Sequence, residues 1–229
     1  MKIFAHRGYS HKYPEGTWIA YEKAVEAGAD GFECDVRLSK DNQVVCFHDR
    51  NLKRIGNSKK AVRNLTAARL RDLVQAITLE ELLDLSIETK RDLLIETKHP
   101  VFAGGEIEKR TLEIINRKAN AIKQAKIEVT VMSFSYFAVR RMKKRYYNVM
   151  KVIKYPLAFL IRPTKDIAID IQVLKKHPGI IKRMKSGRIY VWTVNSEEDL
   201  KWLNKREIFG VITDRPKRAR RFLVSSHNG

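Results

Sequence analysis

The chain has 229 residues, of which 44% are hydrophobic, so it can bury a sizeable core as one large domain or two small ones. It contains no run of about 18 apolar residues, so no membrane-spanning helix is expected. The 46 lysines and arginines outnumber the 26 aspartates and glutamates, which gives a formal net charge of +20. A field of that sign attracts nucleic acid, anionic lipid headgroups or phosphate-bearing substrates without choosing between them.

The cysteines and the N-terminus bear on the compartment. Cys34 and Cys46 are the two cysteines of the sequence, too few for a disulfide framework, which favours a reducing environment. The apolar stretch at the N-terminus ends before His6 and is too short for the apolar region of a secretory signal. We therefore expect a cytoplasmic protein.

Apolar segments rich in β-branched residues recur along the chain, with helical patterns between them. The segments that predict strands are 3–5, 31–38, 44–47, 93–95, 129–132, 149–153, 167–171, 189–194 and 209–213. The segments that predict helices are 17–27, 79–85, 107–124, 134–145 and 197–205, with Thr78 and Ser196 placed as N-caps. Strand alternating with helix favours a parallel sheet covered by helices, as a barrel or as an open doubly wound sheet.

The sequence shows no internal repeat and no linker. We therefore predict a single domain over residues 1–229, with residues 217–229 as a basic C-terminal tail. Of the nine candidate strands, 44–47 is the one that an eight-stranded barrel would leave out.

The second and third predicted strands are too close for a parallel crossover, which needs about a dozen residues, so they must form an antiparallel hairpin. With Asp41 and Asn42 as the two central turn residues, Asp35 lies directly opposite His48. Glu33 then lies two residues away on the same face, because side chains alternate along a strand. Two carboxylates and a histidine are therefore expected to converge.

Carboxylates inside apolar strands are unusual. Glu33 and Asp35 share one face of a strand, and a hard divalent cation would neutralise them; a solvated strand face is the alternative. Glu96 ends another apolar strand, and Lys98 follows on the same face, where it could bind phosphate oxygens or act as a plain counter-charge. Because the ends of several strands build the site in α/β barrels, three such carboxylates favour a metal site.

Two histidines also stand next to strand ends. A diester displacement needs one base and one acid, and His6 and His48 can supply them. Arg7 suits bidentate recognition of a phosphate, and Asp49 could orient His48 or simply end the strand. A histidine as close to the carboxylates as His48 could also ligate the metal, which leaves His6 as the firmer half of the pair.

The order of these residues resembles the glycerophosphodiester phosphodiesterase family, whose signature runs H-R, E-x-D and H-D. The matching blocks are His6-Arg7-Gly8, Pro14-Glu15-x-Thr17, Gly28-Ala29-Asp30-Gly31-x-Glu33-x-Asp35-Val36 and His48-Asp49-x-x-Leu52. Later blocks are Ile95-Glu96-x-Lys98, Ser133-Phe134, Trp192-Thr193-Val194-Asn195 and Gly210-Val211-Ile212-Thr213-Asp214-x-Pro216. The match covers roughly residues 3–216, and the combination is highly specific although each tripeptide alone is weak.

The resemblance implies a TIM-type (β/α)8 barrel, here with a hairpin extension after the second strand, and hydrolysis of glycerophosphodiesters to an alcohol and glycerol 3-phosphate. It also implies a divalent cation, Mg2+ or Ca2+. The implied roles are His6 and His48 as the acid–base pair, Glu33, Asp35 and Glu96 as metal ligands, Arg7, Lys98 and Trp192 as substrate contacts, and Glu15 and Asp49 as supporting residues. For Trp192 the alternative is a large residue of the barrel core.

Some positions depart from the family pattern. Gly16 stands where the family usually has asparagine, and residues 53–57 differ from the Arg-Thr-Thr run that tends to follow the H-D motif. None of these changes removes a proposed catalytic or metal-binding residue. They bear on the choice of substrate more than on activity.

Two other functions compete. A lysophospholipase D or sphingomyelinase D-like enzyme on the same barrel would suit the basic stretches 140–145 and 217–221, which favour transient contact with an anionic membrane surface. A nucleic-acid or acidic-polymer binding protein would share the charge, but the sequence holds no such binding motif. We expect a small phosphodiester as the partner and no specific nucleic acid.

Overall fold

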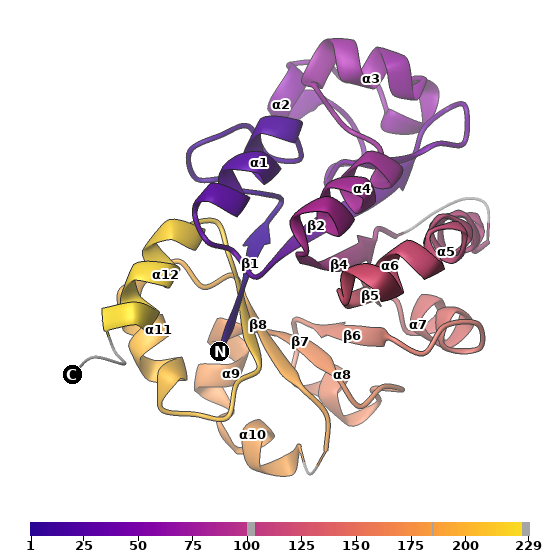
Figure 1. Cartoon of the computed structure of the whole chain (residues 1–229). Helices are drawn as coiled ribbons and strands as arrows, with labels where there is room; N and C mark the ends of the chain where they lie inside the picture. The colour runs from indigo at the N-terminus through magenta and orange to yellow at the C-terminus, as the bar shows by residue number, and fades with distance from the viewer. Residues whose placement is uncertain (100–103, 185, 226–229) are drawn as a thin grey trace.

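The computed structural model describes residues 1–99, 104–184 and 186–225. Its centre is a closed barrel of eight parallel strands, in which β1 pairs with both β2 and β9 (Figure 1). The strands are β1 (Lys2–His6), β2 (Gly31–Leu38), β4 (Asp92–Thr97), β5 (Val129–Ser133), β6 (Val149–Ile153), β7 (Ile167–Asp170), β8 (Ile189–Trp192) and β9 (Gly210–Thr213). The predicted TIM-type barrel is confirmed, and the ninth strand, β3 (Val44–Cys46), pairs with β2 outside it.

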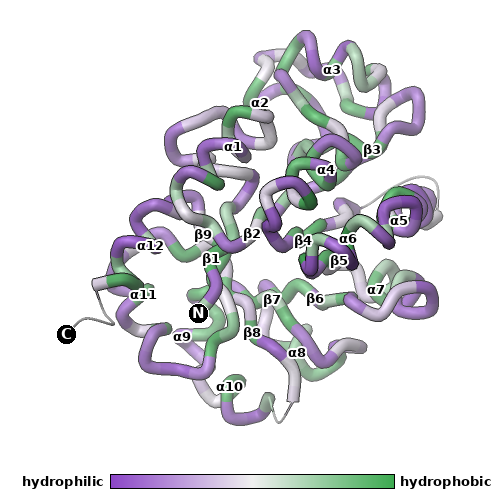
Figure 2. Tube along the Cα trace, in the orientation of Figure 1, coloured by the Kyte–Doolittle hydropathy of each residue, from purple (hydrophilic) through white to green (hydrophobic). Residues whose placement is uncertain are grey.

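Helices surround the barrel. They are α1 (Trp18–Glu26), α4 (Leu79–Thr89), α5 (Glu106–Arg117), α6 (Ala119–Ala125), α7 (Tyr136–Lys143), α8 (Leu157–Leu160), α9 (Ile171–Lys176), α10 (Gly179–Arg183), α11 (Glu197–Asn204) and α12 (Pro216–Ser225). Figure 2 shows hydrophobic stretches along the strands and hydrophilic stretches on the outer helices. Side chains of the strands fill the barrel interior, among them Phe4, Leu94, Met150, Tyr190 and Ile212. None of the helices within the described residues is long and apolar enough to cross a bilayer.

The predicted caps explain where several helices begin. Thr78 accepts a hydrogen bond from the backbone N–H of Glu81, and the Glu81 carboxylate accepts one from the Thr78 N–H, which is a complete capping box. The side-chain oxygens of Thr17 and Ser196 cap α1 and α11 by accepting the backbone N–H of Ala20 and of Asp199, without the second bond of a capping box. The predicted single helix over residues 107–124 is wrong in one respect, because it is interrupted at Lys118 between α5 and α6.

The hairpin is confirmed, but its predicted register is wrong by one residue. Asn42 adopts a left-handed conformation (φ 58°) and its N–H bonds to the Ser39 carbonyl oxygen, so the turn has three residues instead of two. Val36 therefore pairs with Cys46. Asp35 faces Phe47 across the ladder, and its carbonyl oxygen accepts the Phe47 N–H at 2.9 Å. His48 follows beyond the end of β3, where strand alternation no longer sets its direction.

The segment between β2 and α4 is an insertion into the barrel, which we define as residues 44–78. It contains β3, α2 (Lys53–Gly56), a 3-10 turn (Val62–Asn64) and α3 (Ala67–Val74). Its buried side chains form a small core of their own that includes Phe47, Leu52 and Leu70. Sequence analysis did not predict the helices of this insertion.

The stretch predicted as a basic C-terminal tail is helical over residues 217–225, which belong to α12. Ala219 and Leu223 are spaced four residues apart and are buried in the same apolar cluster as Ile3 of β1. Arg220 pairs with Asp30 and also donates to the Gly28 carbonyl. Residues 226–229 lie outside the described residues.

Ion pairs lie at the N-terminal ends of the strands. Arg188, just before β8, pairs with Glu128 just before β5 and with Asp166 just before β7. Lys2 at the start of β1 pairs with Asp92 at the start of β4, and Asp92 also accepts the Glu128 backbone N–H. Each of these carboxylates therefore has a basic partner.

Candidate active site

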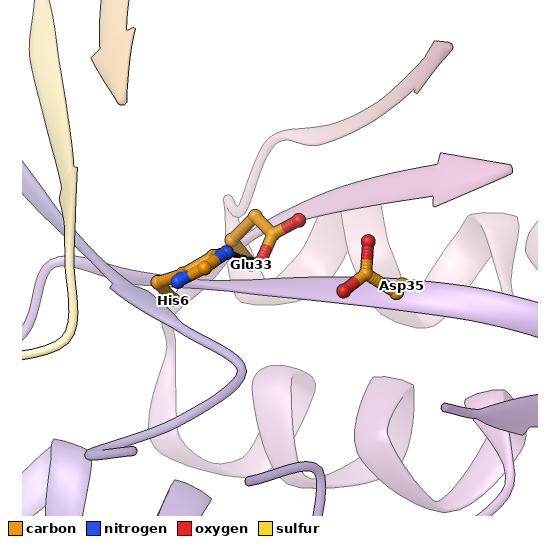
Figure 3. Close-up of side chains that lie close together, drawn as sticks. All are labelled: His6, Glu33 and Asp35. Carbon is orange, nitrogen blue, oxygen red and sulfur yellow. Dashed lines mark ion pairs between the residues drawn. The ribbon is translucent and has the colours of Figure 1, made fainter. Parts of the chain in front are cut away.

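Strand register brings the predicted site residues together at the opposite end of the barrel, where the strands end. Because β1 is in register with β2, His6 lies beside Glu33, and because β2 is in register with β4, Asp35 lies beside Glu96. Figure 3 shows His6 next to Glu33, with Asp35 farther along β2. The C-terminal end of the strands is where the active sites of α/β barrels are built.

Three of these side chains form a group of candidate metal ligands. One atom each of His6, Glu33 and Asp35 lies within 4.8 Å of the others, and both carboxylates are almost completely buried. Two carboxylate oxygens and an imidazole nitrogen suit a divalent cation. Glu96 is not in this group; its Oε1 accepts a hydrogen bond from Lys98 at 2.6 Å. Its role as a ligand stays a prediction.

Two cations face the carboxylates. Lys98 Nζ lies 2.8 Å from Asp35 Oδ1, and Arg7 Nε lies 2.7 Å from Asp35 Oδ2. Burial alone would raise the pKa of Asp35, but Lys98 and Arg7 outweigh it and hold that pKa well below its usual value. Asp35 is therefore ionised at neutral pH.

The other two carboxylates are less well compensated. Burial and the charges of Asp35 and Glu96 raise the pKa of Glu33 well above its usual value. Burial and the charge of Asp35 raise the pKa of Glu96 to about 7, against the opposing effect of Lys98. Among the described residues, Glu33 forms no ion pair with a lysine or arginine side chain. A buried carboxylate in that position gains from an added positive charge, which is the property of a metal ligand.

Each of the two predicted catalytic histidines is oriented by a carboxylate. His6 Nδ1 lies 2.6 Å from Asp214 Oδ1, and His6 Nε2 lies 3.9 Å from Glu33 Oε2. His48 Nδ1 lies 2.6 Å from Asp49 Oδ1. Hydrogen bonding of Nδ1 to a carboxylate leaves Nε2 of each ring as the nitrogen available to other partners. The two histidines differ in position: a ring nitrogen of His6, and not of His48, belongs to the candidate ligand group.

His48 nonetheless approaches the site, as predicted. It lines a small cavity together with Arg7, Glu15 and Asp35. The backbone carbonyl of His48 accepts a hydrogen bond from Arg37, which fixes the chain after β3. Burial lowers the pKa of His48, although the charge of Asp35 acts in the opposite direction.

The predicted supporting residues Glu15 and Asp49 are linked by a residue of the insertion. Arg54 on α2 donates to both oxygens of Glu15 at 2.7 Å and to Asp49 at 2.8 Å. Glu15 in turn accepts from Arg7 at 2.9 Å, and Asp49 bonds to His48. One arginine therefore connects the partners of two site residues.

Two aromatic side chains lie at the C-terminal ends of other strands, Phe134 just after β5 and Trp192 at the end of β8. Trp192 packs edge-on against Phe134, with ring centroids 5.5 Å apart, and Lys98 Nζ lies 5.7 Å from the centroid of Phe134. The indole Nε1 of Trp192 is buried and has no hydrogen-bond partner among the described residues. A buried donor without a partner at a mouth is suited to a ligand hydroxyl or phosphate oxygen.

Sequence analysis gave no role to two residues of the site, Asp214 and Lys151. Asp214 follows the end of β9 and accepts hydrogen bonds from Ser10 and Asn195 as well as bonding to His6. Burial would raise the pKa of Asp214, but the hydrogen bond from His6 and the other two bonds lower it to about 2. Lys151 is a buried cation on β6 that donates to the carbonyl oxygen of Phe134. A carboxylate after an apolar strand, the signal used for Glu96, would also have found Asp214.

Two glycines near the site have positive φ angles, which most other residues adopt only with strain. Gly8 has φ 83°, and a Cβ there would lie 2.7 Å from backbone atoms of Ala20, so the H-R-G turn requires glycine. Gly16 has φ 72°. Glycine and asparagine are the residues that most readily adopt this conformation, which explains how glycine can replace the asparagine usual in the resembling family.

Comparison with known proteins places this site in a family. Residues 6–218 match the model of the glycerophosphoryl diester phosphodiesterase family. The chain is 30% identical to a probable glycerophosphodiester phosphodiesterase 1 of Mycobacterium tuberculosis, over 96% of this chain and 92% of that protein. It is 32% identical to a glycerophosphodiester phosphodiesterase of Bacillus altitudinis, over 95% and 96% of the two chains.

Solved structures were compared with the fold of this chain. The glycerophosphodiester phosphodiesterase of Thermotoga maritima superposes with a TM-score of 0.79 at 30% identity, over 94% of this chain and 95% of that one. A phosphodiesterase of Oleispira antarctica, solved with the product sn-glycerol-3-phosphate, has a TM-score of 0.81 at 21% identity over 98% and 97%, which supports the fold alone. The chain therefore belongs to the glycerophosphoryl diester phosphodiesterase family, a family of hydrolytic enzymes, as its motifs predict.

Proposed function

We propose that the protein hydrolyses glycerophosphodiesters to an alcohol and sn-glycerol 3-phosphate in a reaction that depends on a divalent metal ion. The observation that carries this proposal is the meeting of His6, Glu33 and Asp35 at the mouth of the barrel, with Arg7 and Lys98 beside them. Relatives named for this activity cover nearly the whole chain. The product bound to the Oleispira enzyme is the one that this reaction would release.

The donor set favours Mg2+ or Ca2+ as the metal. Glu33 and Asp35 offer the oxygen ligands that both ions prefer, and the predicted third ligand, Glu96, lies beside Asp35 in the register of β2 and β4. His6 Nε2 is then kept for proton transfer. A cation held there would act as a Lewis acid on a phosphoryl oxygen and as a template for the substrate.

The chain's own residues supply the proton transfers and the charge. With Nδ1 held by Asp214 or Asp49, the Nε2 atoms of His6 and His48 are available as one base and one acid. The nucleophile is either water or the neighbouring hydroxyl of the glycerol. The hydroxyl would first form a cyclic phosphate as the alcohol leaves, and water would then open it to glycerol 3-phosphate, so that each displacement needs one base and one acid. Arg7 and Lys98 contribute donors to the phosphoryl oxygens, and Trp192 Nε1 offers a donor to the glycerol.

The test is hydrolysis of glycerophosphocholine by purified His6→Ala and His48→Ala variants. Loss of one general acid or base costs about 10²- to 10⁴-fold in turnover. His11→Ala is the matched control, because His11 lines the cavity beside His6 but has no carboxylate partner among its described contacts. EDTA should abolish the parental activity, and separate addition of Mg2+ and Ca2+ should identify the metal. Near-parental turnover of both variants would remove the acid–base assignment.

The proposal includes two further expectations, one about the cellular compartment and one about domain organisation. The free, buried thiols of Cys34 and Cys46 are compatible with a reducing cytoplasm. The helix α12 packs against β1 of the barrel, which is compatible with a single domain.

A second candidate function, lipid-directed hydrolysis as in a lysophospholipase D, is favoured by exposed apolar side chains around α8.

A further inference from the structure

Exposed apolar side chains gather in two neighbouring connections of the barrel. Ten large hydrophobic side chains are exposed among the described residues, and seven of them follow β5 or β6, which pair with each other. Tyr147 lies just before β6 and is set apart from the other six. These six define what we call the β5–β6 rim: Phe134, Phe137, Tyr155, Leu157, Leu160 and Ile161. Four of the six are more than 60% exposed within residues 155–161 alone. A soluble protein rarely exposes such a concentration of apolar side chains without a partner for it.

The rim is held in place by buried neighbours. Phe159 of α8 is only 4% exposed and packs into the cluster that contains Ile153 and Ile167. Arg162 stacks on Phe159, at 3.9 Å from its ring centroid, and donates to its carbonyl oxygen. Lys143 at the end of α7 donates to the Pro163 carbonyl. The exposed side chains are therefore presented on an anchored turn.

The segment that carries the rim has charged side chains of one sign only. Residues 134–165 contain nine lysines and arginines and no aspartate or glutamate. Lys154 and Lys165, at either end of the connection that carries α8, are exposed. An apolar surface bordered by basic side chains is complementary to an anionic bilayer, where lipid tails meet negatively charged headgroups.

The rim also reaches the catalytic mouth. Phe134 belongs to both, because its ring packs against Trp192 and lies under Lys98 Nζ. Its carbonyl oxygen accepts from the buried Lys151 of β6. A glycerol bound near Trp192 would thus have an apolar surface on one side and the carboxylate group on the other.

We propose that the β5–β6 rim docks the enzyme onto an anionic lipid bilayer and admits glycerophosphodiesters that carry an acyl chain, such as lysophospholipids, to the site. This inference rests on the proposed phosphodiesterase function. It adds the substrate class and the surface that would recruit it.

The experiment is cosedimentation with vesicles of equal parts phosphatidylglycerol and phosphatidylcholine, compared with vesicles of phosphatidylcholine alone. The parental protein should bind the anionic vesicles, and added salt should weaken binding because surface charges are screened. The triple variant Leu157→Ser/Leu160→Ser/Ile161→Ser should bind at least about tenfold more weakly, since it loses the apolar contact. The double variant Lys154→Gln/Lys165→Gln should bind more weakly to anionic vesicles only.

The matched control is Leu73→Ser/Val224→Ser, which removes two apolar side chains of 40% and 55% exposure from α3 and α12. It should bind vesicles like the parent. Equal binding by the triple variant and the parent would overturn the inference, as would failure of the parental protein to bind anionic vesicles at low salt. Concentration-dependent dimers that the triple variant abolishes, without vesicle binding by the parent, would assign the rim to a second copy instead.

Hydrolysis of soluble glycerophosphocholine separates this inference from the proposed function. All of these variants should retain it, because none touches the catalytic mouth. Parental hydrolysis without vesicle binding would leave the proposed function standing and reject the rim. Vesicle binding without hydrolysis of either soluble or lipid diesters would reject the proposed function.

Discussion

Both ends of the barrel hold clusters of charged side chains, but the two ends differ in how many of their carboxylates are paired with a cation. At the N-terminal ends of the strands, Arg188 bridges Glu128 and Asp166, so each carboxylate has its cation. At the C-terminal ends, Glu33, Asp35 and Glu96 are all buried, while Arg7 and Lys98 both converge on Asp35. Glu33 is left with the His6 ring at 3.9 Å.

The difference separates two uses of buried charge. A paired network can stabilise the fold, or at least not weaken it, because each desolvated charge is compensated. A cluster of like charges costs stability in the free protein and gains it back when a cation binds. One end of the barrel is therefore expected to govern stability and the other to govern activity. Substitutions at the two ends should then have opposite signatures.

The largest expected effect is on activity, from Glu33→Gln. Loss of a metal ligand removes several kcal/mol of transition-state stabilisation, or about 10³-fold in kcat/KM. The free energy of unfolding, measured in EDTA, should stay the same or rise, because a buried like charge is gone. Kinetics with glycerophosphocholine and urea unfolding measure the two quantities.

Asp92→Asn is the matched control for that prediction, since Asp92 is a carboxylate at the paired end that contacts Lys2 and the Glu128 backbone. It should lower the free energy of unfolding and leave kcat/KM of the folded enzyme unchanged. If Glu33→Gln were destabilising in EDTA and fully active, the contrast between the two ends would be lost.

The next effect is on stability, from Arg188→Met. Arg188 is the shared partner of Glu128 and Asp166 and stacks near the ring of Phe209, at 4.8 Å from its centroid. Its removal leaves two uncompensated carboxylates, so we expect a loss of about 2–4 kcal/mol in the free energy of unfolding. The triple variant Arg188→Met/Glu128→Gln/Asp166→Asn should recover part of it. No recovery would show that the packing of Arg188, and not its charge, is what matters.

The same contrast explains what the sequence can predict. Glu33, Asp35 and Glu96 could be found because carboxylates are conspicuous in short apolar strands, and parallel strands that end at one edge must bring them together. The same rule would have identified Asp214, which follows the apolar strand β9. That Lys98 and Arg7 would converge on Asp35 and leave Glu33 uncompensated depends on side-chain directions that no spacing encodes.

Local backbone conformation and short helices limited how much of the remaining structure the sequence could predict. The one-residue error in the hairpin comes from Asn42, whose left-handed conformation makes a three-residue turn out of a sequence that also suits two. The helices of the insertion are short, with four residues in α2 and eight in α3, and bury at most two side chains each, so they offer too few turns for a helical period to be recognised. In α12 the spacing of Ala219 and Leu223 was present, but the basic residues between them concealed it.

The smallest effect concerns the link between the insertion and the site, Arg54. Arg54 touches neither His48 nor Arg7 directly, but it holds their partners Asp49 and Glu15. Arg54→Met should lower kcat/KM about tenfold, equivalent to about 1.4 kcal/mol, by loosening both side chains. Because Arg54 is half exposed, the free energy of unfolding should change by less than about 1 kcal/mol.

Arg71→Met is the control for Arg54, because Arg71 is equally exposed in the same insertion and pairs with Glu81, away from the site. It should leave kcat/KM unchanged. Arg54→Lys distinguishes positioning from simple charge: a lysine cannot bridge both carboxylates with the geometry of a guanidinium, so it should restore part of the activity only. Full restoration by lysine would reduce the role of Arg54 to a local positive charge, and the insertion would then influence the site through His48 and Asp49 alone.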